Sequence, residues 1–217
     1  MQGDQIDATI EGFQALYSRA NTLQVFRLAG FCAIQLSIDY AQRRDWDKSV
    51  EWGQRALDIA EEYQDCNLGS EAAKSIILSK RERLRHSPYR SGFEELINFL
   101  ITWAEKNRQM GNVENQMDKY GLLSNVEILR ANRFEDVEKR EASRRCLAWL
   151  EQAEGLVNLL PEREQTSAIA EIKFKSFYAL LLLDQRTAAI ETLRLAHLLF
   201  QRDGKHREAQ KMLTIIS

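Results

Sequence analysis

Small and apolar residues recur at helical spacing along this chain. The clearest case is Asp45 to Tyr63, DWDKSVEWGQRALDIAEEY, where small residues return at i, i+4 and i+7. The stretch Gly3 to Tyr17, GDQIDATIEGFQALY, repeats the pattern. The aligned pairs are Ala8 with Ser49, Gly12 with Gly53, Ala15 with Ala56 and Leu16 with Leu57. Such spacing places side chains on one stripe of an α-helix, and small side chains there let two helices approach closely.

The residues before Asp45 form a helical pattern of their own. Its apolar and small positions, at i, i+3, i+4 and i+7, are Ala33, Leu36, Ser37 and Tyr40. A turn at Arg44-Asp45 separates this pattern from the next one. Helix, short turn and small-residue helix together predict an antiparallel αα-hairpin.

This hairpin resembles the tetratricopeptide repeat. The matching signature positions, in order and spacing, are Ala33, Leu36, Ser37, Tyr40, Trp46, Ser49, Gly53 and Ala56. Serine replaces the usual glycine at Ser37 and the usual alanine at Ser49, and no proline follows the second helix, which we expect to continue to about Asp65. The resemblance implies an all-α fold, a right-handed superhelix of stacked antiparallel helix hairpins (a TPR-like α-solenoid).

Weaker copies of the pattern follow. Phe93–Leu96 and Phe134–Val137 have the entry of the second helix, and Ala189 and Ala196 restore the small stripe. The copies lie further apart than in the minimal form of the repeat, so we expect lengthened helices and loops. Thr22 and Ser70 are expected N-caps. The expected organisation of residues 1–217 is a single domain with a half-repeat at 1–20, hairpins at 22–66, 69–110, 113–160 and 165–203, and a terminal helix at 205–217.

The first and last helices of this scheme lack partners within the chain. Gly3 to Tyr17 matches the second helix of a hairpin, and His206 to Ile216 matches a first helix. Both could be capping helices of a complete solenoid. We favour a segment of a longer solenoid, because Ile10, Phe13 and Leu16 are very apolar for a helix with an exposed face.

Composition supports a helical protein of the cell interior. Only 2 prolines and 10 glycines interrupt 217 residues, and the formal net charge is −2, without the basic excess typical of nucleic-acid-binding chains. Three cysteines without short spacing are typical of reduced thiols. The opening residues lack the apolar stretch of a signal peptide, and the apolar run Tyr178–Leu183 is far below the roughly 18 residues of a membrane span. We therefore expect a cytoplasmic or nuclear protein that is not embedded in a membrane.

No motif in the sequence indicates catalysis. His86, His197 and His206 are far apart, and no metal-binding, phosphate-binding or nucleophile-elbow pattern occurs. Cys32 has the surroundings of a core residue. Cys146 follows Arg145, and a neighbouring cation can lower the pKa of a thiol and make it reactive, but we expect a buried, unreactive thiol here too. The sequence therefore predicts a protein that is not an enzyme and needs no cofactor or metal.

The resemblance also implies a binding surface. First helices of such hairpins line a concave groove that receives a peptide or helix. Carried onto the clear hairpin, the groove positions are Phe31, Ile34, Ile38, Ala41 and Gln42. Family members that grip acidic C-termini have lysine and asparagine where Ile34 and Ile38 stand here, so a carboxylate clamp is not expected. An apolar lining suits an amphipathic helix or an apolar segment of a protein partner, although neighbouring repeats could instead cover these residues.

A basic stretch, KRERLRHSPYR, is the strongest charge cluster. Its cations are Lys80, Arg81, Arg83, Arg85 and Arg90. Phosphates or an acidic partner would suit this patch. The alternative is a solvated helix end, where cations favour the C-terminal carbonyls. Since only Tyr89 offers a ring for base stacking, nucleic acid is the more distant interpretation.

Together these features predict a non-catalytic scaffold for protein–protein interaction, which binds a partner peptide or helix within a larger protein or complex. One alternative is a regulatory or sensor domain that controls an attached effector. A more distant alternative is binding of phosphate or nucleic acid through Lys80–Arg90.

Overall fold

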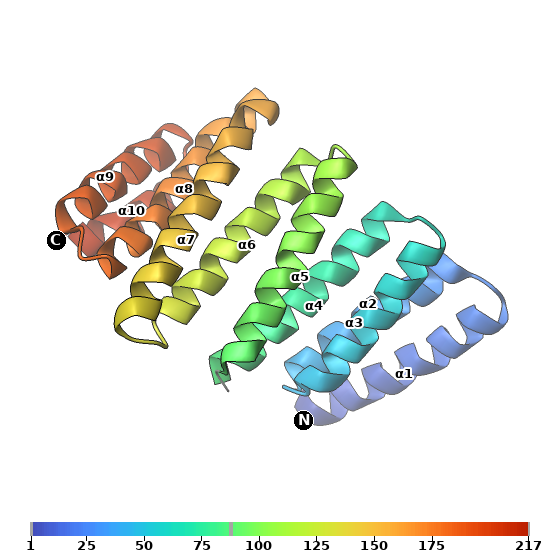
Figure 1. Ribbon diagram of the computed structural model, residues 1–217. Helices are drawn as coiled ribbons and strands as arrows, with labels where there is room; N and C mark the ends of the chain where they lie inside the picture. Colours follow the sequence, from blue (N-terminus) through green and yellow to red (C-terminus); the bar gives the residue numbers. More distant parts are fainter. Residues whose placement is uncertain (1, 87–88, 217) are drawn as a thin grey trace. The chain divides into compact units, whose positions relative to one another are not determined.

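The computed structural model describes residues 2–86 and 89–216, with side chains for residues 6–86 and 89–215. These residues form ten α-helices and one short 3₁₀ turn, and they contain no strand (Figure 1). The helices are α1 (Gln2–Thr22), α2 (Phe26–Gln42), α3 (Trp46–Glu62), α4 (Cys66–His86), α5 (Arg90–Gln109), α6 (Val113–Ala131), α7 (Asp136–Leu156), α8 (Glu162–Leu182), α9 (Arg186–Arg202) and α10 (His206–Ile216), with the 3₁₀ turn at Val157–Leu159. The expectation of an all-α chain is therefore confirmed.

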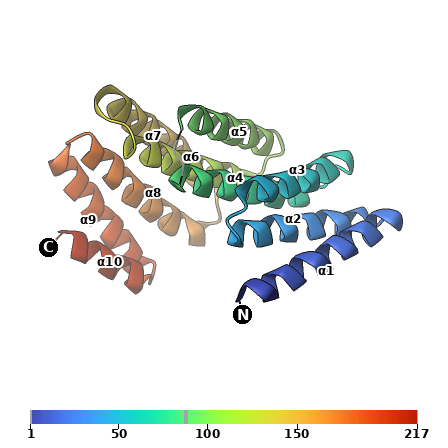
Figure 2. The ribbon, with the colours of Figure 1, turned by 90° about the horizontal axis from the view of Figure 1, so that it is seen from below.

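The chain divides into two compact units, Met1–Gly92 and Phe93–Ser217. In the first unit α1 packs on α2, α2 on α3 and α3 on α4, and α2 also contacts α4 (Figure 2). In the second unit the packing again follows chain order from α6 to α10, and α6 also contacts α8. Arg130 of α6 joins Glu94 of α5 in an ion pair. Each unit is therefore built from helices that pack mainly on their neighbours in the sequence.

One turn geometry recurs at helix ends. In each case a residue in the left-handed region is followed by a residue whose N–H bonds to the carbonyl five positions earlier. Such left-handed closure satisfies carbonyls at the helix end. The left-handed residues are Gln24, Arg44, Gln64, Gly111, Asp184 and Gly204, with φ between 54° and 74°. The matching bonds run from Val25 to Ala20, Asp45 to Tyr40, Asp65 to Ala60, Asn112 to Asn107, Gln185 to Leu180 and Lys205 to Phe200, all 2.8–3.0 Å.

The turns space the helices of the first unit evenly. Helices α2, α3 and α4 begin at Phe26, Trp46 and Cys66, which are equally spaced in the sequence. After two of these turns an aspartate caps the next helix: the Asp45 side chain accepts from the Lys48 N–H at 3.2 Å, and Asp65 from the Leu68 N–H at 3.0 Å.

This geometry corrects three predicted boundaries. Thr22 is the last residue of α1 rather than an N-cap, and its hydroxyl donates to the Ser18 carbonyl. Helix α3 ends at Glu62 rather than near Asp65. Ser70 is not the N-cap of the next helix, because the turn is made earlier, at Gln64. Helix α4 begins at Cys66, and Ser70 is buried inside it.

Small residues bring α2, α3 and α4 close together. Ser49, Gly53 and Ala56 of α3 are buried, and a Cβ on Gly53 would lie 2.6 Å from Cγ1 of Ile76 in α4. The small residues predicted along one side of α3 thus lie where α3 packs closely on its neighbouring helices. The aligned positions of α1 behave differently: Ala8, Gly12 and Ala15 are not buried, and nothing lies within 4 Å of a Cβ built on Gly12.

Four buried serines link these helices. The Ser37 hydroxyl donates to the Ser49 carbonyl at 2.7 Å, and the Ser49 hydroxyl donates to the Ser37 carbonyl at 2.6 Å. Ser75 Oγ lies 2.5 Å from Ser37 Oγ, and Ser79 Oγ lies 2.6 Å from Ser49 Oγ. Each hydroxyl therefore has a partner, as burial requires.

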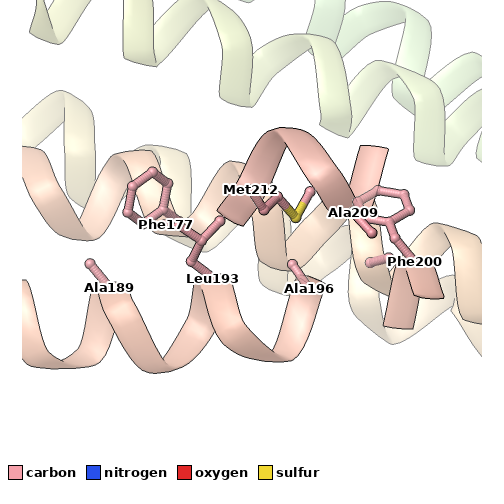
Figure 3. Close-up of a cluster of buried hydrophobic side chains, with 8 residues drawn as sticks. Phe177, Ala189, Leu193, Ala196, Phe200, Ala209 and Met212 are labelled. Atoms are coloured by element: carbon pink, nitrogen blue, oxygen red, sulfur yellow. The ribbon is translucent and has the colours of Figure 1, made fainter. Parts of the chain in front are cut away.

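The second unit has an apolar core of its own between α8, α9 and α10. Figure 3 shows Phe177, Leu193, Phe200 and Met212 gathered in this cluster, together with small residues. The small residues are Ala170, Ala189, Ala196 and Ala209. The stripe expected at Ala189 and Ala196 is thus buried.

The contrast between Gly53 and Gly12 predicts that alanine at the two positions changes the stability of the protein in opposite directions. Gly53→Ala forces Ile76 to move, and we expect a net loss of about 1–2 kcal/mol, since overpacking outweighs the better helix propensity of alanine. Gly12→Ala has open space around it, so we expect a gain of up to about 1 kcal/mol. Urea unfolding followed by circular dichroism measures both. Equal shifts in the same direction would contradict the close contact at Gly53.

Candidate partner-binding groove

Helices α2 and α4 border a groove of about 370 Å³ in the first unit. The residues that line it are Ile34, Ile38, Ala41, Gln42, Trp46, Glu71, Lys74, Ser75, Leu78, Ser79 and Glu82. Four of the five groove positions predicted from the sequence are among them. Phe31 is not, although it lies one turn before Ile34 on α2, with 65% of its surface exposed.

The α2 side of the groove is apolar apart from Gln42, and its isoleucines differ in how deeply they are buried. Ile34 is 9% exposed and is packed mainly into the protein, whereas Ile38 is 39% exposed. Leu78 lines the groove from α4 with 38% exposed. Ile38 and Leu78 are thus the apolar side chains that a ligand would cover.

The floor of the groove is made by the serine network. Ser75 and Ser79 line it, and both are buried. Because these hydroxyls are bonded to Ser37 and Ser49, the floor needs no hydrogen bond from a ligand.

One end of the groove is aromatic. Trp46, the first residue of α3, lines the groove and stacks on His86 with ring centroids 6.1 Å apart and planes 12° apart. Trp46 is one of the signature positions matched in the sequence, and the structure adds that it borders the groove.

Sequence reasoning missed the whole α4 side, because the start of α4 was misplaced. An alignment of α2 with α4 that starts from their first residues, Phe26 and Cys66, would have identified the missed α4 residues. It pairs Phe31 with Glu71, Ile34 with Lys74, Ile38 with Leu78 and Gln42 with Glu82. All four α4 residues found in this way line the groove.

The basic stretch is interleaved with acids. Arg81 and Arg85 both donate to Glu82, at 3.2 and 2.8 Å, and Arg83 donates to Asp47 at 2.7 Å. Lys80 and Arg90 also have interaction partners. Acidic side chains of the protein thus pair with three of the five cations, which reduces the positive field of the predicted patch.

The two cysteines singled out in the sequence are buried. Burial, with a contribution from the charge of Glu127, raises the pKa of Cys146 to about 12. The Arg145 guanidinium donates to Glu127 at 2.8 Å, and the burial of Cys146 agrees with the expected buried, unreactive thiol. Burial also raises the pKa of Cys32. Neither thiol has the depressed pKa of a reactive cysteine.

The described part of the chain holds no group of three or more histidine, cysteine or acidic residues arranged for a metal ion. Among its helices, none combines the length and the apolar character needed to cross a membrane. No family model matches the sequence, and no curated protein is significantly similar to it.

The unequal depth of the two isoleucines makes a prediction. Ile34→Asp places a carboxylate in a nearly closed site, and we expect a loss of about 3 kcal/mol in the free energy of unfolding. Ile38→Asp leaves the charge in water, and we expect a loss of about 1 kcal/mol. Urea unfolding of both variants checks the order. If Ile38→Asp costs as much as Ile34→Asp, Ile38 is a core residue and not a groove residue.

Proposed function

We propose that this chain is a TPR-like α-solenoid segment that acts as a non-catalytic scaffold, binding an amphipathic helix of a protein partner in the α2–α4 groove. The observation that carries the proposal is the groove itself. It is a hollow between α2 and α4, with exposed apolar side chains over a floor whose polar groups are already satisfied.

The proposed solenoid is supported by the packing within each unit. Helices contact their chain neighbours, and α2 contacts α4 as α6 contacts α8. The recurring left-handed turn and the even spacing of the helix starts in the first unit are further support, since a repeat architecture reuses one supersecondary unit.

A helix fits the groove better than an extended strand. Both borders are helices whose backbone groups are bonded within the helix, so no sheet edge is available there for strand addition. On α2 the lining runs from Ile34 to Gln42, a rise of about 12 Å at about 1.5 Å per residue. This length matches about two turns of a bound helix, whose apolar residues at i, i+3 or i+4 and i+7 would contact Ile38 and Leu78.

A peptide-binding experiment tests the proposal. Labelled amphipathic helical peptides of two to four turns are screened against the full chain by fluorescence anisotropy. We expect binders whose affinity falls at least tenfold in Ile38→Asp, because an unpaired carboxylate would meet the apolar stripe.

Ile101→Asp is the matched control, since Ile101 is also an isoleucine with 39% of its surface exposed, but on α5. Circular dichroism verifies that both variants keep their helices. An equal loss of binding in Ile101→Asp, or no binder at millimolar peptide, contradicts the proposed function.

A further inference from the structure

The rim of the groove carries two opposite charges on α4. Glu71 and Lys74 both line the groove and both are exposed. Among the described residues neither makes an ion pair or a side-chain hydrogen bond, with each other or with any neighbour. The third charge at the rim differs, because Glu82 accepts hydrogen bonds from Arg81 and Arg85.

The two unpaired charges lie on one side of α4. Residues three apart in a helix are neighbours on its surface, so Glu71 and Lys74 are separated by about one turn. Leu78 follows Lys74 one turn further along the same edge of the groove. A ligand that covers Leu78 and Ile38 therefore passes beside a negative charge and then a positive one.

We propose that the groove selects a helix of another protein that carries one basic and one acidic residue about a turn apart beside its apolar stripe. The basic residue faces Glu71, and the acidic residue faces Lys74. This inference rests on the proposed function and deepens it, because it assigns the apolar stripe to affinity and the two rim charges to the choice of partner.

Charge complementarity supports this occupant. A helix with two basic residues at the same positions would oppose Lys74, and one with two acidic residues would oppose Glu71; like charges brought together disfavour the wrong partner. Exposed pairs at a rim contribute modestly, so each mismatch should weaken binding about fivefold. The rim charges thus contribute more to the discrimination between partners than to the binding affinity.

Three peptides and three proteins test the inference. The peptides share one apolar stripe taken from a binder of the preceding screen and differ only at two flanking positions one turn apart: Lys and Glu, Lys and Lys, or Glu and Glu. The proteins are the full chain and its variants Lys74→Glu and Glu71→Lys. Binding is measured by fluorescence anisotropy at low salt and again at high salt.

We expect the preferred peptide to change with the rim. The unmodified chain should favour the mixed peptide, Lys74→Glu the doubly basic one and Glu71→Lys the doubly acidic one, each by about fivefold at low salt and less at high salt. Asp58→Lys is the matched control, since Asp58 is an exposed acid on α3 that does not line the groove. It should leave the order of the peptides as in the unmodified chain.

Two results would overturn the inference while leaving the apolar groove intact. One is the same order of peptides in all three proteins. The other is a self-associated chain, seen by sedimentation, that dissociates in Lys74→Glu, because the occupant would then be a second copy. Failure of every peptide to bind the unmodified chain would instead contradict the proposed function itself.

Discussion

The close approach of three helices around four serine hydroxyls is the constraint on which the first unit depends. Short side chains are needed where α3 meets its neighbours, and a Cβ on Gly53 would already collide with Ile76. A hydroxyl can enter such a contact only if it finds partners, and Ser37 and Ser49 each donate to the other's carbonyl. Because Ser75 and Ser79 extend the same network into α4, the serines that join the helices also form the floor of the groove.

Backbone geometry sets the second constraint, which is register. A left-handed residue closes one helix and the next helix starts two residues later, at Phe26, Trp46 and Cys66. Three of these left-handed residues are Gln24, Arg44 and Gln64. None is a glycine, the residue that enters this region most readily, so the surrounding helices must hold the strained conformation in place. The even spacing that results brings equivalent faces of α2 and α4 to the two sides of one groove.

The sequence predicted the α2–α3 hairpin well, because its signature residues are those that pack. Ser49, Gly53 and Ala56 are buried, and four predicted groove residues of α2 do border a hollow. Prediction failed where the local conformation is set by tertiary contacts. Gln64 carries no sequence signal for a left-handed turn, so the start of α4 and its groove residues were misplaced.

Two further features have the same origin. Gly12 aligns with Gly53, but an alignment shows only the residue type. It does not show whether another helix packs on the small residues, as α4 does at Gly53 and no helix of the described residues does at Gly12. The neighbour of Cys146 in the sequence, Arg145, is a cation that bonds to Glu127, a residue 18 positions away in the sequence that no local pattern connects to it. Whether groove residues bind a partner stays a prediction, since periodicity identifies exposed apolar positions and not what covers them.

The repeated turn has a consequence for how such a chain can grow. The stretch from Phe26 to Asp65 begins just after one left-handed closure and ends on another of the same geometry. A tandem duplication of this stretch would therefore meet compatible backbone at both joints, without redesign of either. Lengthening by whole modules, rather than by single residues, would therefore preserve the turn geometry at every joint.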